Sequence, residues 1–482
     1  MVTFLVAFFA LIIGYLVYGK LVDTMFGPTD AQTPALKHND GVDYIPMPTW
    51  KVFMIQLLNI AGLGPIFGAL AGALWGPVVY LWIVGGSIFA GGVHDYLSGM
   101  ISLREDGMSI SEVVGNHMGK TMLTIMRVFA VVLLVLVGTV FATGPAMLLH
   151  KLFGFTTTGW LVIVLVYYFL ATVLPIDAII GRIYPLFGAC LIIMAVGLMV
   201  GMLTGVGGHV MPEMTLANLY PATPDKQLPI WPLMFITVAC GAVSGFHSTQ
   251  SPLMARCLKD ERLGRPVFYG AMIAEGLIAL IWAAAGITFY NGTPGLAAAL
   301  KAGGPGGAVY EICIGFMGSG IGMTLAMLGV IVCPITSGDT AFRGARLAIA
   351  DWFAIPQVTT SKRLTLAVPL LLVGAILSQI DFNIIWRYFS WTNQTLAMIV
   401  LWTGATYLYR KAENPNAYII PMIPAIFMSA VSSTYILQAK EGLQLSTTIT
   451  WPAGIAFTVL FTVMFLKHTV WSKDTTRACN AK

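Results

Sequence analysis

The sequence predicts an all-α integral membrane protein, and three observations lead to this prediction. Of the 482 residues, 57% are hydrophobic. Only 10% are charged, whereas soluble domains carry about 25%. Apolar stretches of roughly 20 residues, the length that crosses a bilayer as a helix, recur along the whole chain. No segment remains that could form a soluble domain of useful size.

We expect about thirteen transmembrane helices of roughly 20 residues each. They divide the chain into an N-terminal helix with a cytoplasmic loop (1–50), a first five-helix repeat (51–206), a second five-helix repeat (230–410), and two extra helices with a cytoplasmic tail (411–482). The expected spans are 3–18, 52–74, 78–102, 122–149, 160–174, 184–204, 230–254, 267–290, 309–333, 364–380, 384–409, 418–437 and 449–465.

The basic residues support this span count independently of hydropathy. With the N-terminus outside, most of the 26 lysines and arginines fall in loops on one side. This bias follows the positive-inside rule and predicts an N-terminus outside the cell membrane and a cytoplasmic C-terminus. The net charge of +5 is therefore explained by the membrane topology, and we expect no nucleic-acid partner. The bilayer and a small-molecule substrate are the expected partners, and the oligomeric state is open.

Two spans contain glycine and proline interruptions. The second span carries Gly62, Gly64 and Pro65 in "NIAGLGPIFGALAG", and the seventh carries Gly241 and Gly245 in "CGAVSGFHSTQSP". Broken backbone at membrane depth is tolerated where protein or a water-filled cavity satisfies the freed groups. Glycines also permit close helix packing, which is the alternative interpretation.

The two interruptions are five spans apart, so they enter the membrane from opposite sides. This is the arrangement of an inverted five-plus-five repeat with a discontinuous helix first in each half. In transporters of this design the substrate binds near the midplane, between the broken helices. We therefore predict a substrate site at both interruptions. Its expected residues are Gly62, Gly64, Pro65, Gly241, Gly245, His247, Ser248 and Gln250.

Ionisable residues at membrane depth are costly and are usually functional. His94 and Asp95 fall in the third span, His247 in the seventh and Glu275 in the eighth. Histidines and buried carboxylates can carry the proton of a proton-coupled transporter. Fixed interhelical hydrogen bonds are the alternative role for these four side chains.

A second candidate ion site lies at the end of the ninth span. The hydroxyls of Thr336 and Ser337, with the carbonyl of Cys333 and carbonyls from the first interruption, would form an oxygen cage suited to Na⁺. Hydroxyls that bond back to helix carbonyls are the alternative. Nearby, the four-residue spacing of Asp339 and Arg343 predicts an ion pair.

Two other polar features have plainer interpretations. Asn393 and Gln394 lie in the apolar eleventh span, "FSWTNQTLAMIV", where interhelical hydrogen bonding is expected. The six cysteines show no ligand spacing and are expected to be small membrane hydrophobes. No cofactor motif is present, and the coupling ion, H⁺ or Na⁺, is open.

Together these motifs resemble the carbon starvation protein A family of bacterial inner-membrane transporters. The stretches that carry the resemblance run from the second span through the eleventh: "AGLGPIFGALAGALWG", "GGVHDYLSGMISLREDGMSISEVVG", "CGAVSGFHSTQSP", "YGAMIAEGL", "TSGDTAFRGARLAIAD" and "WTNQTLAMIVLWT". The resemblance implies peptide uptake during carbon starvation or pyruvate–proton symport, and a LeuT-like fold. It also implies that Cys333, Thr336 and Ser337 match the sodium-holding positions of sodium-driven relatives. Better-known members are longer, so we expect a short-type member.

The leading interpretation is an ion-coupled secondary transporter that takes up small carboxylate-bearing nutrients and is not an enzyme. A channel is the first alternative, but the sequence contains neither a charged ring nor a TVGYG-like filter. An intramembrane enzyme is the second, based on the aspartates of "VHDY" and "SGDT". The sequence lacks HExxH and any marked nucleophile.

Overall fold

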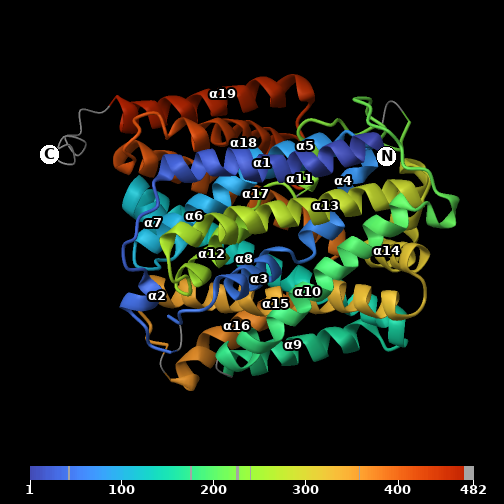
Figure 1. Cartoon of the computed structure of the whole chain (residues 1–482), viewed down its shortest axis with the longest axis horizontal. Coiled ribbons are helices and arrows are strands. Elements are labelled where there is room, and N and C mark those ends of the chain that lie inside the picture. Colours follow the sequence, from blue (N-terminus) through green and yellow to red (C-terminus); the bar gives the residue numbers. More distant parts are fainter. Residues whose placement is uncertain (42–43, 174–175, 224–226, 239, 358, 472–482) are drawn as a thin grey trace.

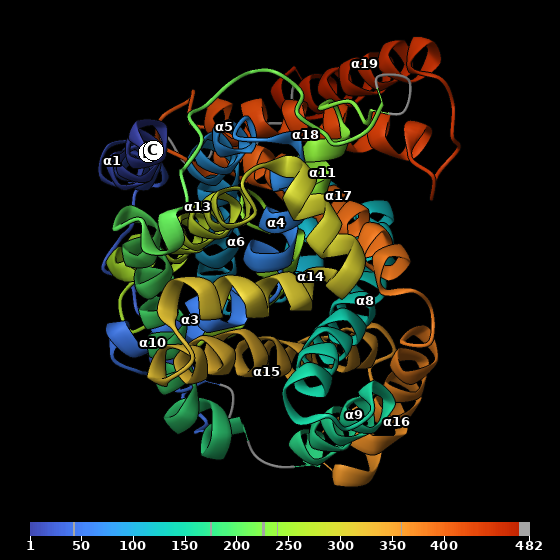
Figure 2. The ribbon, with the colours of Figure 1, turned by 90° about the vertical axis from the view of Figure 1, so that its right-hand side faces the viewer.

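The computed structural model of the chain describes residues 1–41, 44–173, 176–223, 227–238, 240–357 and 359–471. Within these ranges every regular element is a helix. The end of the predicted cytoplasmic tail, 472–482, lies outside them. Figure 1 shows the longer helices running along one common direction across the molecule, and Figure 2 shows the same bundle turned by 90°.

The first half of the chain contains α1 and the helices up to α10. Their bounds are α1 Val2–Phe26, α2 Pro34–Lys37, α3 Thr49–Ile60, η1 Gly64–Gly68, α4 Ala69–Gly72, η2 Ala73–Trp75, α5 Val79–Gly85, η3 Gly86–Gly91, α6 Gly92–Arg104, α7 Ile110–Met118, α8 Lys120–Phe153, α9 Thr157–Val173, α10 Ile176–Leu203 and η4 Val206–Gly208. The elements η1 and η3 are π-helical turns, a distortion that is common at functional sites.

The second half begins at the other interruption. Its elements are α11 Leu233–Thr237, α12 Gly245–Ala255, η5 Glu261–Leu263, η6 Arg265–Tyr269, α13 Gly270–Phe289, α14 Thr293–Met317, α15 Ile321–Trp352, α16 Thr360–Leu377, α17 Phe382–Lys411, α18 Ile419–Gln438, α19 Thr447–Phe465 and η7 Leu466–Val470.

Seven described helices are individually long and apolar enough to cross a membrane, and the bent pair 49–60 and 64–75 would add an eighth. Shorter and broken helices make up the remainder, so the thirteen-span count stays a prediction. The all-helical, apolar architecture itself is as expected.

One expected span is wrong. The stretch 309–333 is not a single helix, because α14 ends at Met317 and α15 begins at Ile321. Gly318 has φ +81°, a conformation that glycine adopts readily and that ends the helix. α15 then continues to Trp352, so Thr336 and Ser337 lie in the middle of a helix rather than at its end.

The helices α12 and α13 lie at the centre of the bundle. α15 packs along α8, and α12 packs against α3, α6 and α17. Side chains along α13 are almost all buried, whereas α19 leaves much of its surface exposed. Figure 2 shows α17, α18 and α19 gathered on one side of the bundle, and α9 and α16 at another edge.

Candidate functional site

The first interruption separates α3 from η1, and the two segments are bent by 55°. The carbonyls freed there are bonded by side chains from α15. Ser337 Oγ donates to Leu58 O at 3.0 Å, and Cys333 Sγ donates to Ala61 O at 3.0 Å. This satisfies the requirement that backbone groups at membrane depth find partners inside the protein.

The second interruption separates α11 from α12, and its partners come from α17. Asn393 Oδ1 accepts hydrogen bonds from Phe246 N at 2.7 Å and from Ser244 Oγ at 3.1 Å. Gln394 Nε2 donates to Val238 O and Val243 O, each at 3.2 Å. The predicted interhelical hydrogen bonds of Asn393 and Gln394 are therefore confirmed, with α12 capped by a side chain of another helix.

The two interruptions meet in space, as the sequence predicts. A Cβ added to Gly64 would collide with the side chain of Cys240, and one added to Gly241 would lie 3.6 Å from Pro65 Cα. Gly245 lies against the backbone of α17, where an added Cβ would meet Ala397 N at 2.7 Å. The two interruptions therefore lie in direct contact, and at Gly245 the close approach of α17 backbone leaves no room for a side chain.

Four ionisable side chains form one connected chain beside this junction. His94 Nδ1 lies 2.7 Å from Asp95 Oδ1, and His247 Nδ1 lies 2.8 Å from Asp95 Oδ2. His247 Nε2 lies 3.2 Å from Glu275 Oε2. Each of the four side chains is fully buried. The structure therefore unites all the predicted proton-coupling candidates, which come from α6, α12 and α13.

His247 faces a carboxylate at each ring nitrogen. Its Nδ1 is within hydrogen-bond distance of Asp95, whereas its Nε2 and Glu275 Oε2 are 3.2 Å apart and make no hydrogen bond. The acceptor Glu275 Oε1 and the nitrogen His94 Nε2 have no hydrogen-bond partner among the described residues. The chain therefore has an open position at each end. Buried charges of this kind destabilise a protein unless they are paired. Ionisable side chains at membrane depth therefore usually have a function.

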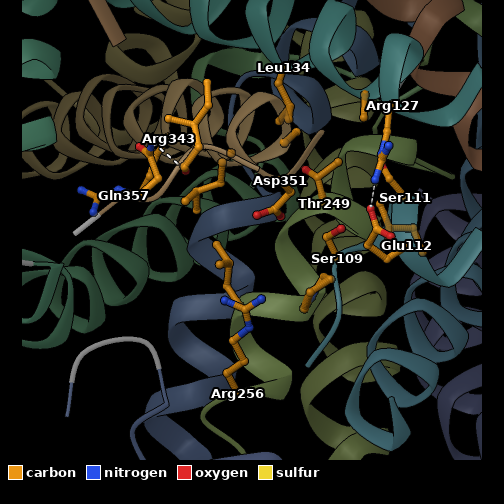
Figure 3. A pocket seen from close by; sticks show the side chains of 18 of the residues that line it. Ser109, Ser111, Glu112, Arg127, Leu134, Thr249, Arg256, Arg343, Asp351 and Gln357 are labelled. Atoms are coloured by element: carbon orange, nitrogen blue, oxygen red, sulfur yellow. Dashed lines mark hydrogen bonds and ion pairs between the residues drawn. The ribbon is translucent and has the colours of Figure 1, made fainter. Parts of the chain in front are cut away.

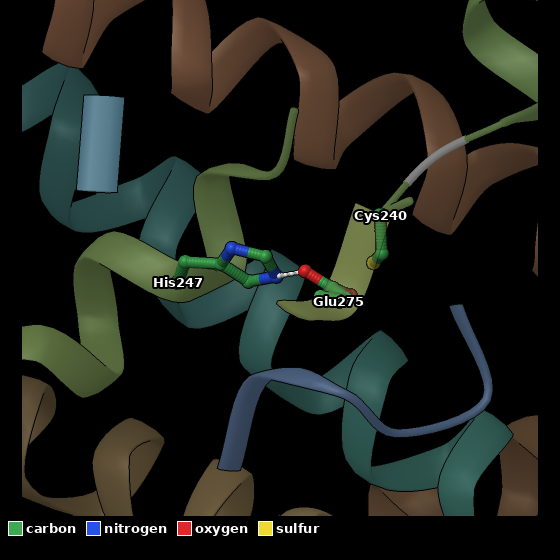
Figure 4. A group of neighbouring side chains, drawn as sticks. All are labelled: Cys240, His247 and Glu275. Carbon is green, nitrogen blue, oxygen red and sulfur yellow. Dashed lines mark ion pairs between the residues drawn. The ribbon is translucent and has the colours of Figure 1, made fainter. Parts of the chain in front are cut away.

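Cys240 completes a group of three donors with His247 and Glu275, whose ligand atoms lie within 4.8 Å of one another. Figure 4 shows the His247 ring turned toward Glu275, with Cys240 on the segment that precedes α12. Thiol, imidazole and carboxylate are donors that zinc accepts. Both nitrogens of His247 also face carboxylates, those of Asp95 and Glu275. The sequence around Cys240 has no metal-ligand spacing, so this proximity could not be predicted from the sequence.

A polar seam between α3 and α12 was missed by the sequence analysis. Gln56 Nε2 donates to Ser251 Oγ at 3.3 Å. The acceptors Gln56 Oε1, Asn59 Oδ1 and Gln250 Oε1 are buried and have no partner among the described residues. Gln56 and Asn59 are one helical turn apart, so their (i, i+3) spacing within an apolar span was the available signal. Ser248, by contrast, bonds back to Gly245 O at 2.7 Å.

The oxygen atoms of the predicted sodium site do converge. Ser337 Oγ lies 3.0 Å from the carbonyls of both Cys333 and Leu58, and Thr336 Oγ1 lies 2.8 Å from Cys333 O. In this arrangement the hydroxyls donate to the carbonyls, so both the cage and the back-bonding interpretation fit. The predicted ion pair of Asp339 and Arg343 is present at 3.6 Å.

A cavity of about 380 Å³ opens between α7, α8, α12 and α15. Figure 3 shows Arg127 paired with Glu112 at this cavity, with Arg256 and Asp351 facing the same space. Its wall includes Thr249, two residues beyond His247 on α12. None of the four buried ionisable residues lines the cavity.

Comparison with known proteins identifies the relatives of this chain. The family model described as "Carbon starvation protein CstA" matches residues 1–148 and 143–302. A protein of Haemophilus influenzae named "Uncharacterized membrane protein" is 44% identical over 342 residues, which cover 61% of this chain and 92% of that protein. The "Peptide transporter CstA" of Bacillus subtilis is 27% identical, with 87% of each chain covered.

Two further similarities bear on transport and on fold. The "Pyruvate/proton symporter BtsT" of Escherichia coli is 27% identical over 53% of this chain and 44% of that protein. A mutant of the Eremococcus coleocola manganese transporter superposes with a TM-score of 0.54 and 12% identity, covering 91% of this chain and 99% of that structure. At such low identity, the second similarity concerns the fold alone.

Proposed function

Because this chain belongs to the carbon starvation protein CstA family, we propose that it is a proton-coupled secondary transporter of small carboxylate-bearing nutrients, peptides or pyruvate. The observation that carries the proposal is the buried chain of His94, Asp95, His247 and Glu275 at the meeting point of two helix interruptions. The names of its curated relatives, a peptide transporter and a pyruvate/proton symporter, agree with it.

The proposed architecture has thirteen spans with a LeuT-like pair of inverted five-helix repeats, discontinuous at the second and seventh spans. The breaks after Ile60 and Thr237 support it. In Figure 1 the start of α1 and the end of α19 lie at opposite ends of the molecule, as an odd number of crossings requires. We place the N-terminus in the periplasm and the C-terminus in the cytoplasm of a bacterial inner membrane.

The proposed substrate site lies between the interruptions and along α3 and α12. Its members are those predicted from the sequence, Gly62, Gly64, Pro65, Gly241, Gly245, His247, Ser248 and Gln250. To these we add Gln56 and Asn59, whose amide oxygens have no partner among the described residues. The N-terminus of α12 favours an anionic carboxylate, the group that a peptide C-terminus and pyruvate share.

The cavity between α8, α12 and α15 is the proposed cytoplasmic vestibule. It lies at the end of the bundle where the basic loops gather in the proposed topology. Arg127, Arg256 and Arg343 line it together with the acidic Glu112 and Asp351. A mixed lining of this kind suits substrates that carry a carboxylate, with or without an amino group. The fully buried interruptions and this open vestibule together describe a conformation closed to the periplasm.

Coupling follows when proton and substrate affinity change together between two conformations. A proton on His247 or Glu275 adds positive charge beside the interruption and favours an anionic substrate there. When the vestibule gives water access to the chain, the proton leaves and the substrate carboxylate loses that attraction. The inward proton gradient would then drive uptake.

Sodium coupling is the second candidate, and it rests on a separate observation. The oxygens of Cys333, Thr336, Ser337 and Leu58 converge on the first interruption. A hard cation prefers such oxygen ligands. If Na⁺ binds there, the hydroxyl hydrogens must turn away from the carbonyls to free the oxygen lone pairs.

The test is uptake by the purified protein in proteoliposomes, with labelled pyruvate and a labelled dipeptide in parallel. An inward proton gradient without sodium should drive accumulation of at least one substrate. Accumulation that requires sodium and ignores the proton gradient would replace the proton proposal by the sodium one. Absence of gradient-driven accumulation of either compound would remove the proposed substrate class.

A further inference from the structure

A groove of about 740 Å³ lies outside the transport site, between the α7–α8 junction, α17 and α19. We call it the α17–α19 groove. Its walls are mainly apolar side chains, among them Met122 and Phe129 of α8, Met398 and Trp402 of α17, and Phe461 of α19. A groove with this lining in a membrane protein faces lipid rather than water.

Three polar groups along the deep part of the groove have partners inside the protein. Thr395 Oγ1 bonds to Trp391 O at 2.8 Å, and Thr406 Oγ1 bonds to Trp402 O at 3.0 Å. The indole of Trp402 donates to Ser429 Oγ at 3.0 Å. These three donors are not available to a polar ligand, so the deep part of the groove suits a hydrocarbon chain.

One end of the groove is basic. Arg410 and His468 line it there, and the exposed Lys467 is the neighbour of His468 in η7. Arg410 donates one hydrogen bond, to His117 O at 3.0 Å. It makes no ion pair with a carboxylate in the part of the chain that the structure describes. The remaining guanidinium donors match a phosphate group.

The length of the groove matches one leaflet of a bilayer. From Arg410 to Thr395 α17 rises about 22 Å, at about 1.5 Å per residue. Half of a bilayer, headgroups included, is about 20–22 Å thick. The basic end therefore lies at headgroup level while Thr395 lies near the midplane. In the proposed topology this is the cytoplasmic leaflet.

We propose that the α17–α19 groove binds one acidic phospholipid, with its phosphate at Arg410 and His468 and its acyl chains along Met398 and Phe461. Charge complementarity and leaflet depth select this ligand over a neutral lipid or a peptide. The groove borders α17, whose Asn393 and Gln394 side chains hydrogen-bond to the backbone of the second interruption. The lipid therefore contacts a helix that supports the transport site, although the proposal does not depend on the transported substrate.

The test is native mass spectrometry of the full-length protein in detergent, titrated with phosphatidylglycerol and, separately, with phosphatidylcholine. Wild type should retain one tightly bound phosphatidylglycerol and should bind phosphatidylcholine at least tenfold more weakly. Arg410→Gln should weaken phosphatidylglycerol binding about tenfold, because it removes charge-assisted hydrogen bonds to phosphate. Arg262→Gln, at an exposed arginine of η5, is the matched control and should change nothing.

A second pair of variants tests the deep part of the groove. Met398→Trp fills it and should abolish the tightly bound lipid, whereas Ile455→Trp, on the exposed surface of α19, should not. Each variant is first checked for a thermal unfolding midpoint close to that of wild type. Equal binding of both lipids, or no effect of Arg410→Gln, would overturn the proposal. So would lipid binding that appears only after the chain is truncated at Trp471, because the tail would then be the occupant.

Discussion

His247 hydrogen-bonds through Nδ1 to Asp95 Oδ2 at 2.8 Å, across 152 positions of the sequence. The contact joins α12, which begins at the second interruption, to the first turn of α6. Since the other nitrogen of His247 faces Glu275, one imidazole lies between two buried carboxylates. A movement of α12 away from α6 or α13 would break one of these contacts, and in the proposed mechanism this links conformation to protonation at His247.

Asp95→Asn should separate transport from coupling. The amide keeps the size of the side chain, but it replaces one carboxylate acceptor with a donor and cannot carry the negative charge that faces His94 and His247. We expect gradient-driven uptake in proteoliposomes to fall at least tenfold while substrate exchange without a gradient continues. Asp260→Asn, at a partly exposed loop aspartate, should leave both activities unchanged. Full gradient-driven uptake by Asp95→Asn would show that the chain is a fixed structural network.

Asn393→Ala should destabilise the protein through the second interruption. The variant leaves Phe246 N and Ser244 Oγ without the acceptor that they share in a fully buried setting. Loss of the helix cap, together with two buried donors left without an acceptor, should lower the free energy of unfolding by about 2–3 kcal/mol. Thermal unfolding in detergent measures this, with Asn383→Ala on the exposed start of α17 as the control. Equal midpoints for the two variants would contradict the capping role.

Gly245→Ala should impair folding or transport because its new methyl group meets backbone atoms. An added Cβ would lie 2.7 Å from Ala397 N and would also collide with Asn393 O, neither of which is the end of a flexible side chain. Gly85→Ala is the control, since no atom lies within 4 Å of its added Cβ. Within a helix that change should stabilise by about 0.5–1 kcal/mol. Comparable expression and uptake for both variants would rule out the close approach of α12 to α17.

Glu213 should make the stability of the N-terminal end pH-dependent. The N-terminal amine, Thr3 Oγ1 and the backbone amides of Thr3 and Val2 hydrogen-bond its carboxylate and lower its pKa to about 2. Because the pKa of Glu213 is lower in the folded state, its carboxylate stabilises the folded protein at pH values above the pKa of the unfolded state, which is near 4.3. This contribution is lost as the pH falls from that value to about 2.

The measurement is the thermal unfolding midpoint between pH 3 and pH 7 for wild type and Glu213→Gln. The wild type should be the more stable of the two at pH 7, and the difference should shrink toward pH 3. A difference that is constant across this range would mean that the Glu213 carboxylate does not titrate with the predicted sign.

Much of the candidate site was visible as polar residues in apolar surroundings. His94, Asp95, His247 and Glu275 stand out because membrane burial makes a charge costly, and the same logic marked Asn393 and Gln394. Their mutual contacts could not be read from the chain, because α6, α12 and α13 are brought together only by packing. Cys240 escaped notice for the opposite reason, since an isolated cysteine in an apolar stretch resembles an ordinary hydrophobe.

The ninth span shows why hydropathy fails locally. Asp339 and Arg343 lower the mean hydropathy of their stretch, so the predicted span stops at residue 333. In the structure the two side chains form an ion pair and are largely buried, so the helix continues to Trp352. The glycines at 318 and 320, unremarkable in an apolar sequence, mark the true boundary. Pairing between side chains is a tertiary property that a single-residue scale cannot include.

By itself, the sequence determined the environment of this protein, its helical class and the places where its helices are interrupted. These properties follow from composition and from the local conformational limits of glycine and proline, which act on neighbouring residues. Only the tertiary structure decided that the two interruptions meet, that four ionisable groups form one chain, and that α15 and α17 bond the freed backbone. Those outcomes depend on contacts between residues up to hundreds of positions apart, which form only when the whole bundle packs.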